Sequence, residues 1–368
     1  MTALFLYGTL RHLPHLEVVA GGLEGLTISD AALPDHSVRA MGPLMIPVLV
    51  EEFGASAPGI MVEGLTADQR ARLDFYEDGY GYRTENRTLQ GGRTADVFIP
   101  PANSDRPDAI WTLDAWQPRF AELITMAARE VMLYHGRLSP TEVAARMPSI
   151  RARAGARMRA AHSHHGPGTL GGTVHIDRHE RAYVDFYALD EFTLRHETFS
   201  GAMTEPLDRA VFIANDASIV LPYDPVRDRV LLVEQIRLGP LGRGDQALWQ
   251  LEPIAGRVDG GETPEDCAHR ETREEAGLEL RELIPIAQTY ASPGNATEFH
   301  YIYLGLAELP DDAAGLGGAA DEGEDIKAHI LSFDRLMDMT RSFEAANAPL
   351  VLAALWLAGQ RDHLRGLR

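Results

Sequence analysis

Three glutamates in one short stretch have the type and the spacing to bind a metal ion. Glu271, Glu274 and Glu275 stand at positions i, i+3 and i+4, so they share one face if the segment is helical. Two carboxylates about 4 Å apart repel by roughly 4 kcal/mol at an effective dielectric constant near 20. An exposed ion pair with Arg270 or Arg273 returns only about 0.3–0.5 kcal/mol. A divalent cation would offset the repulsion, and all-oxygen ligands favour Mg²⁺ or Mn²⁺.

The residues before the glutamates favour a metal site over the alternative, which is a solvated acidic helix face. Thr263 is a good N-cap and Pro264 suits the first helical position. Gly277 follows as a stop signal, so we expect a helix that ends at about Ala276. Three glycines between residues 256 and 261 predict a tight loop that returns to the helix start. A plain surface helix does not need such a loop.

The whole stretch resembles the Nudix box, in which a Gly, a Glu, an Arg-Glu pair, a Glu-Glu pair and a second Gly recur at fixed spacing. The one departure is Thr272, which occupies an apolar slot. The resemblance implies an α/β/α sandwich around a mixed sheet, and hydrolysis of a nucleoside diphosphate linked to another group. The matching positions are Gly256, Glu262, Arg270, Glu271, Glu274, Glu275, Gly277 and Leu278.

The flanks of the box resemble the ADP-ribose pyrophosphatase branch of this family, over nearly all of residues 171–368. Pro293 lies sixteen residues beyond Gly277, as in the ADP-sugar enzymes. The branch implies cleavage of ADP-ribose to AMP and ribose 5-phosphate. GDP-mannose hydrolases share several of these features, so a GDP-mannose-type substrate is an alternative. A non-catalytic ADP-ribose sensor is another, although the box is complete.

The resemblance also implies a role for each acidic residue. Glu322 would activate water as the general base, and Glu274 would assist catalysis. Two or three Mg²⁺ ions, or Mn²⁺ in their place, would neutralise the pyrophosphate. The implied metal ligands are the backbone carbonyl of Ala255 and the carboxylates of Glu271, Glu275 and Glu324.

Four further residues match substrate-binding positions of the branch. Arg209 and Arg237 would contact the phosphates, for which arginine offers a planar bidentate fork. Glu298 would bind the sugar side, and Phe186 would stack on adenine. A surface ion pair is the alternative for Arg237 and Glu298, and packing in the core is the alternative for Phe186.

The start of the chain resembles a second family, the γ-glutamylcyclotransferase-like (AIG2-like) domains, which imply a small β-barrel with helices. The turn formed by Tyr7, Gly8, Thr9 and Leu10 would offer backbone N–H groups to a substrate carboxylate. Glu77 would be the general acid and base that takes a proton from the α-amine of a γ-glutamyl group. That amine would attack its own side-chain carbonyl and release 5-oxoproline. A domain that only binds an amine-bearing metabolite is the alternative.

The sequence pattern predicts an α+β protein with two domains. Residues 1–112 read as short strands with one helix, and residues 171–368 as strands mixed with helices. Residues 113–170 read as a helical connector and linker. The linker holds a His-Ser-His-His run at 162–165, which fits a solvated segment better than a metal site. The domain order resembles TrgB-like tellurite-resistance proteins, although one cysteine gives no basis for tellurium chemistry.

Composition sets the remaining expectations. The chain has 368 residues and a formal net charge of −20, which argues against a general nucleic-acid or anionic-membrane partner. Its only cysteine, Cys267, excludes an intrachain disulfide and suits a reducing, cytoplasmic compartment. The segment 182–201 alternates enough to form a sheet exchanged between subunits, so the resemblance also implies a homodimer through the Nudix domain.

Overall fold

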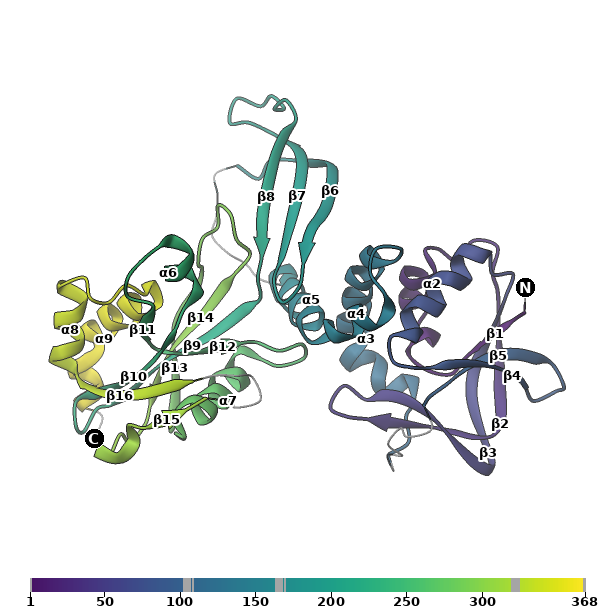
Figure 1. The fold of residues 1–368 in the computed structure, drawn as a ribbon, viewed down its shortest axis with the longest axis horizontal. Coiled ribbons are helices and arrows are strands. Elements are labelled where there is room, and N and C mark those ends of the chain that lie inside the picture. The colour runs from purple at the N-terminus through teal and green to yellow at the C-terminus, as the bar shows by residue number, and fades with distance from the viewer. Residues whose placement is uncertain are drawn as a thin grey trace. The chain divides into compact units, whose positions relative to one another are not determined.

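A computed structural model describes residues 2–101, 107, 109–162, 168, 170–318 and 325–366. The chain divides into two compact units, Met1–Thr169 and Leu170–Arg368 (Figure 1). Strands and helices occur in both, as the α+β prediction requires. The expected boundaries near residues 112 and 170 stay predictions. Among the described residues, no helix is long and apolar enough to span a bilayer.

The first unit is built on a five-stranded sheet in the order β2-β3-β1-β5-β4. β1 pairs antiparallel with β3 and parallel with β5. The backbone N–H of Gln90, in the turn after β4, donates to the carbonyl of Ala32 on β2 at 2.9 Å. This bond links the turn after one edge strand to the other edge strand, so the sheet is strongly curved, while the small barrel that the resemblance implies stays a prediction. The strands are β1 (Leu4–Leu6), β2 (Thr27–Met41), β3 (Ile46–Glu63), β4 (Arg83–Thr88) and β5 (Thr94–Ile99).

The helices of this unit cover the sheet with two hydrophobic clusters. One cluster joins the sheet to Trp116 and Phe120 of α3, and the other joins it to Leu16 of α1 and Leu73 of α2. Thr66 caps α2 in a capping box with Gln69. The helices are α1 (Leu13–Ala20), α2 (Ala67–Asp78), α3 (Leu113–Val131), α4 (Pro140–Ala145) and α5 (Met147–His162).

A buried ion pair ties α5 to α3. The Glu130 carboxylate accepts from the Arg153 guanidinium at 2.6 and 2.9 Å and from the Tyr134 hydroxyl at 3.0 Å. Glu130 and Arg153 are each 1% exposed, so their charges need one another to stay buried. The helices after residue 112 therefore pack as part of the first unit.

The second unit is an α/β/α sandwich, as the Nudix resemblance implies. Its mixed sheet runs β13-β14-β9-β10-β16-β15 through the described residues, with β11 added to β10 and β12 added to β9. β9 and β14 are parallel, and the other pairs are antiparallel. The strands are β9 (Asp216–Asp224), β10 (Arg229–Ile236), β11 (Trp249–Glu252), β12 (Ile254–Arg257), β13 (Glu282–Tyr290), β14 (Phe299–Leu306), β15 (Leu316–Gly317) and β16 (Ile326–Ser332).

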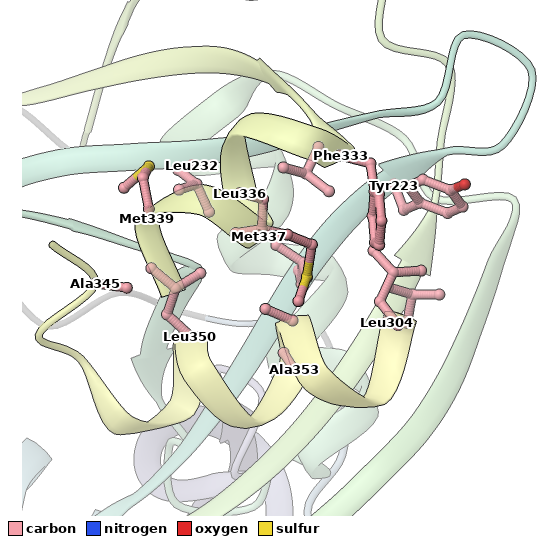
Figure 2. Close-up of a cluster of buried hydrophobic side chains, with 14 of the residues drawn as sticks. Tyr223, Leu232, Leu304, Phe333, Leu336, Met337, Met339, Ala345, Leu350 and Ala353 are labelled. Carbon is pink, nitrogen blue, oxygen red and sulfur yellow. The ribbon is translucent and has the colours of Figure 1, made fainter. Parts of the chain in front are cut away.

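Successive side chains of the central strands point to opposite faces of this sheet and pack into a hydrophobic core on each face. Leu232 of β10 packs toward α8 and α9 with Phe333 and Leu350, as Figure 2 shows. Leu231, the next residue, packs on the opposite face with Ala268 of α7. The helices are α6 (Leu238–Arg243), α7 (Pro264–Ala276), α8 (Phe333–Arg341) and α9 (Ala348–Gly366).

A separate three-stranded antiparallel sheet precedes the sandwich. It is ordered β6-β7-β8, and its hairpins carry exposed apolar residues such as Ile176, Tyr183 and Phe199. The segment 182–201, whose alternating pattern predicted a sheet, therefore lies in a sheet that is separate from the sheet of the sandwich. Its strands are β6 (Val174–Val184), β7 (Ala188–His196) and β8 (Leu207–Ile213).

Candidate active site

The predicted acidic helix is α7, and its bounds confirm the prediction. The Thr263 side chain accepts from the backbone N–H of Asp266, and Gly277 ends the helix with a φ of 62°. The helix buries Cys267, Ala268, Thr272 and Glu275 against the sheet. The hydroxyl of Thr272 donates to the carbonyl of Ala268 at 2.7 Å, so this departure from the box leaves no buried polar group unpaired.

Two of the glutamates lie against strand β12. A Cβ on Gly256 would overlap the carboxyl group of Glu271, so only glycine allows this approach. The Glu275 side chain is 2% exposed, and one of its oxygens lies 3.4 Å from the backbone N of Ala255. The structure thus brings together Ala255, Glu271 and Glu275, as the sequence predicts.

Arg270 holds three carboxylates at once. Its guanidinium bonds both oxygens of Glu262 at 2.9 and 3.0 Å, Glu271 at 2.6 Å and Glu274 at 3.0 Å. The bond to Glu262, with the charge of Glu271, raises the pKa of Arg270. Burial alone would raise the pKa of Glu262, but its bonds to Arg270 lower that pKa below its ordinary value. Arg270 therefore positions the acidic side chains.

The donors present fit a hard divalent cation. Carboxylate oxygens and the Ala255 carbonyl are the ligand types that such ions take. Within the described ranges, no group of three or more His, Cys, Asp or Glu side chains is gathered closely enough to hold an ion. The predicted ligand Glu324 and the predicted base Glu322 lie outside the described residues.

A second cluster gathers around Tyr187, in the turn between β6 and β7. Burial and the charge of Glu298 raise the pKa of Tyr187, and the charges of Arg237 and Arg257 oppose this shift in part. Phe186 meets the Tyr187 ring edge-on at 4.8 Å, and the Arg257 guanidinium lies 5.2 Å from the Phe186 ring centre. Phe186 is 51% exposed, which does not fit packing in the core.

Arg237 and Glu298 both have neighbours in the protein. Arg237 donates through Nε to Glu252 at 2.6 Å, and Glu275 adds to the charges that raise its pKa. Glu298 lies 3.3 Å from the His300 imidazole. Arg237 thus connects the cluster around Tyr187 to the box glutamates.

Arg209 lies apart from this cluster. It is exposed on β8 and donates to the carbonyl of Asp208 at 2.8 Å. In the part of the chain that the structure describes, no contact joins it to Arg237 or to the box glutamates.

Sequence reasoning missed Tyr187, Arg257 and Glu252 as site residues. Arg257 directly follows Gly256, and Tyr187 directly follows Phe186. The resemblance singled out both of these neighbours, so adjacency to them was the available sign of a site residue. Glu252 is 4% exposed and is held by Arg237 and by Asn347 at 3.1 Å. An isolated acidic residue in a strand, such as Glu252, belongs to no motif that would mark it as a site residue.

The first unit brings its own predicted residues together. Tyr7 is 6% exposed and donates to the carbonyl of Phe98 at 2.9 Å. Gly8 precedes the 3₁₀ turn Thr9–Arg11, which buries Leu10 in the core. Burial, and then the charge of Asp78, raises the pKa of Glu77 to about 7. Burial is the main cause that raises the pKa of Tyr7, and the charges of Tyr82 and Glu77 add to it, so Glu77 and Tyr7 interact electrostatically.

Comparison with known proteins bears on both units. The model of the NUDIX domain matches residues 214–353. An ADP-ribose pyrophosphatase of Escherichia coli (strain K12) is 38% identical over 192 residues, which cover 52% of this chain and 91% of that protein. This chain belongs to the Nudix family. The model described as gamma-glutamyl cyclotransferase, AIG2-like, matches residues 4–117.

Two further known proteins match this Nudix enzyme at lower identity. A GDP-mannose pyrophosphatase of Salmonella choleraesuis is 34% identical over 47% of this chain and 90% of its own length. The crystal structure of an ADP compounds hydrolase is 22% identical, covers 51% of this chain and 95% of its own, and has a TM-score of 0.38. As a Nudix diphosphatase, the chain carries its box on β12 and α7.

Proposed function

We propose that the Nudix half hydrolyses the pyrophosphate bond of ADP-ribose, or of a related nucleoside diphosphate sugar, and that it requires Mg²⁺. The match to an ADP-ribose pyrophosphatase over 91% of that protein carries this proposal. The buried Glu275 and the close approach of Glu271 to Gly256 support it. The products would be AMP and ribose 5-phosphate.

The chain's own residues would divide the work. Ala255, Glu271 and Glu275 would hold the ion, with Glu324 as a proposed further ligand. A bound ion of this kind polarises the phosphate and lowers the pKa of a bound water. Arg270 keeps the carboxylates of Glu262, Glu271 and Glu274 in place.

The remaining residues would bind substrate and move the proton. Arg237, next to Glu275, would contact the phosphates. Phe186 is exposed beside Tyr187 and would stack on the base, and Glu298 would meet the sugar. Glu322 stays the proposed base, with Glu274 assisting.

Separation of products tests the proposal directly. The purified chain with excess Mg²⁺ should convert ADP-ribose to AMP and ribose 5-phosphate, which ion-exchange chromatography resolves. GDP-mannose, the substrate named in the second group of relatives, is the matched comparison. Intact ADP-ribose beside an active control enzyme would contradict the proposal, and faster cleavage of GDP-mannose would favour the alternative substrate. Binding of ADP-ribose without cleavage would indicate a sensor.

For the first unit we propose γ-glutamyl cyclotransfer, centred on Glu77. The match to the AIG2-like family and the electrostatic interaction between Glu77 and Tyr7 support it. The backbone N–H groups of Tyr7, Gly8, Thr9 and Leu10 would receive a substrate carboxylate. Release of 5-oxoproline from γ-glutamyl peptides tests it. Binding of an amine-bearing metabolite without release would leave a binding domain.

We also propose that the protein is a cytoplasmic homodimer. The β6-β7-β8 sheet, with its exposed Ile176, Tyr183 and Phe199, supports an exchange between subunits. Exchange would also bring the Arg209 of one subunit to the site of the other. Light scattering that shows a monomer at working concentration would contradict this arrangement.

A further inference from the structure

Glu252 on β11 holds the arginine to which the proposed function assigns the substrate phosphates. Its Oε1 accepts from Nε of Arg237 at 2.6 Å. The Glu252 side chain is buried and the Arg237 side chain is 40% exposed, so the pair reaches from the interior to the surface. Among the hydrogen bonds of the described residues, Arg237 uses only Nε of its guanidinium, which leaves two terminal nitrogens for phosphate oxygens.

The second oxygen of Glu252 is bound by Asn347, which lies just before α9. Nδ2 of Asn347 donates to Oε2 of Glu252 at 3.1 Å. Oδ1 of the same amide accepts from the backbone N–H of Leu350 at 3.0 Å, so Asn347 is also the N-cap of α9. A carboxylate can only accept and a backbone N–H can only donate, so these two partners fix the orientation of the amide.

The hydrophobic core holds the chain on both sides of Asn347. Ala345 and Leu350 are 9% and 0% exposed, and both pack in the cluster that joins α8 and α9 to the sheet, as Figure 2 shows. The amide of Asn347 is therefore anchored by buried residues that precede and follow it. Side chains locked in this way hold the residues of a site in a productive geometry.

A single bond would leave the Glu252 carboxylate poorly fixed. The last torsion of a glutamate side chain is only broadly restricted, so a carboxylate that is bound through one oxygen turns easily. Binding of both oxygens, by Arg237 and by Asn347, fixes the plane of the carboxylate. The direction of the Arg237 guanidinium follows from that plane, because charge-assisted bonds to arginine are geometrically specific.

We propose that Asn347 is a positioning residue for the phosphates of the substrate, and that it acts through Glu252 on Arg237. The inference rests on the proposed function, which places Arg237 at the phosphates. It adds a residue of the C-terminal helix to a site whose other members lie on the sheet and on α7.

Binding of α,β-methylene-ADP-ribose, which cannot be hydrolysed between its phosphates, tests the inference without catalysis. Calorimetry measures its affinity for the full chain in excess Mg²⁺. Asn347→Ser keeps a cap for α9, because serine accepts from the N–H of Leu350, but the shorter side chain loses the bond to Glu252. We expect binding to weaken about tenfold, and KM for ADP-ribose to rise by about the same factor.

Two comparisons separate positioning from a general loss of stability. In an Arg237→Met background, Asn347→Ser should have no further effect on affinity, because both residues act through one chain of bonds. Ser332→Ala is the matched control, since Ser332 caps α8 by accepting from the N–H of Arg335 at 3.2 Å. It should lower the melting temperature but keep the affinity within about twofold.

Each outcome decides the inference. Wild-type affinity in Asn347→Ser, a further loss of affinity in the Arg237→Met background, or an equal loss in Ser332→Ala would overturn it. If circular dichroism shows that Asn347→Ser is unfolded, Asn347→Asp replaces it. Aspartate also caps the helix but places a negative charge beside Glu252, so affinity should fall at least about tenfold.

The same measurements distinguish this inference from the proposed function. A wild type that neither binds the analogue nor cleaves ADP-ribose contradicts the proposed function, and the inference falls with it. A wild type that cleaves ADP-ribose, with an unchanged KM in Asn347→Ser, contradicts the inference alone.

Discussion

Glu275 is the residue whose charge matters most to the proposed hydrolysis. It is buried beside β12, so replacing it with glutamine keeps the packing and removes only the charge. We expect Glu275→Gln to lower kcat for ADP-ribose by about 10³-fold or more at saturating Mg²⁺. Steady-state kinetics measures this. Glu282→Gln, exposed at the start of β13, is the control and should stay within about twofold. Turnover near that of the wild type would refute the assignment of Glu275 as a metal ligand.

Glu77 predicts a pH dependence for the first unit. Burial raises its pKa to about 7, so the carboxylate that can accept a proton predominates only above pH 7. Release of 5-oxoproline should therefore rise with pH through about 7, and below pH 6 it should fall about tenfold for each pH unit. Initial rates between pH 5 and 9 measure this profile. Glu77→Gln should abolish release at every pH. A flat profile would contradict the role of Glu77 as base.

At the scale of single residues, the local sequence pattern predicted some site residues but not others. The difference has a physical reason. Glu271 and Glu275 share a helix face, and helical periodicity is visible in sequence. Tyr187 reaches Arg257 and Glu298 only through the folding of separate strands. No spacing rule relates residues that are joined by tertiary contacts alone.

Gly256 controls how closely β12 approaches α7. Any Cβ there would overlap the Glu271 carboxyl group, which Arg270 holds in place. We expect Gly256→Ala to displace Glu271 and to lower kcat by about 10- to 100-fold, because such supporting positions tune the ligands. Gly277→Ala is an informative comparison, since Gly277 has a φ of 62° but open space around it. It should lower the melting temperature, which calorimetry measures, more than it lowers kcat. Equal activity of Gly256→Ala and wild type would contradict the role of Gly256.

Among the elements, α7 was predicted to the residue while β13 was not. Caps and stops are local signals, and α7 has Thr263, Pro264 and Gly277 in place. β13 contains Pro285, with a register shift between it and Ala287. Pairing with β14 stabilises this strand in spite of its weak pattern. Strand formation here depends on a partner that is distant in sequence.

At the scale of the whole molecule, the two units have separate cores. The clusters of the first unit draw on residues up to Trp116, Phe120 and Ala128, and those of the second begin at Ile219 and Val220. Each core is thus complete without residues of the other unit. We therefore expect each unit to fold independently.

Separating the units therefore gives the last prediction. Residues 170–368 expressed alone should fold and should hydrolyse ADP-ribose within about threefold of the full chain, because α7, β12 and Arg237 all lie in that unit. Residues 1–169 should fold alone but leave ADP-ribose intact. Circular dichroism checks folding, and product chromatography checks activity. If the second unit is folded but inactive alone, hydrolysis requires the first unit, and the prediction of independent activity is wrong.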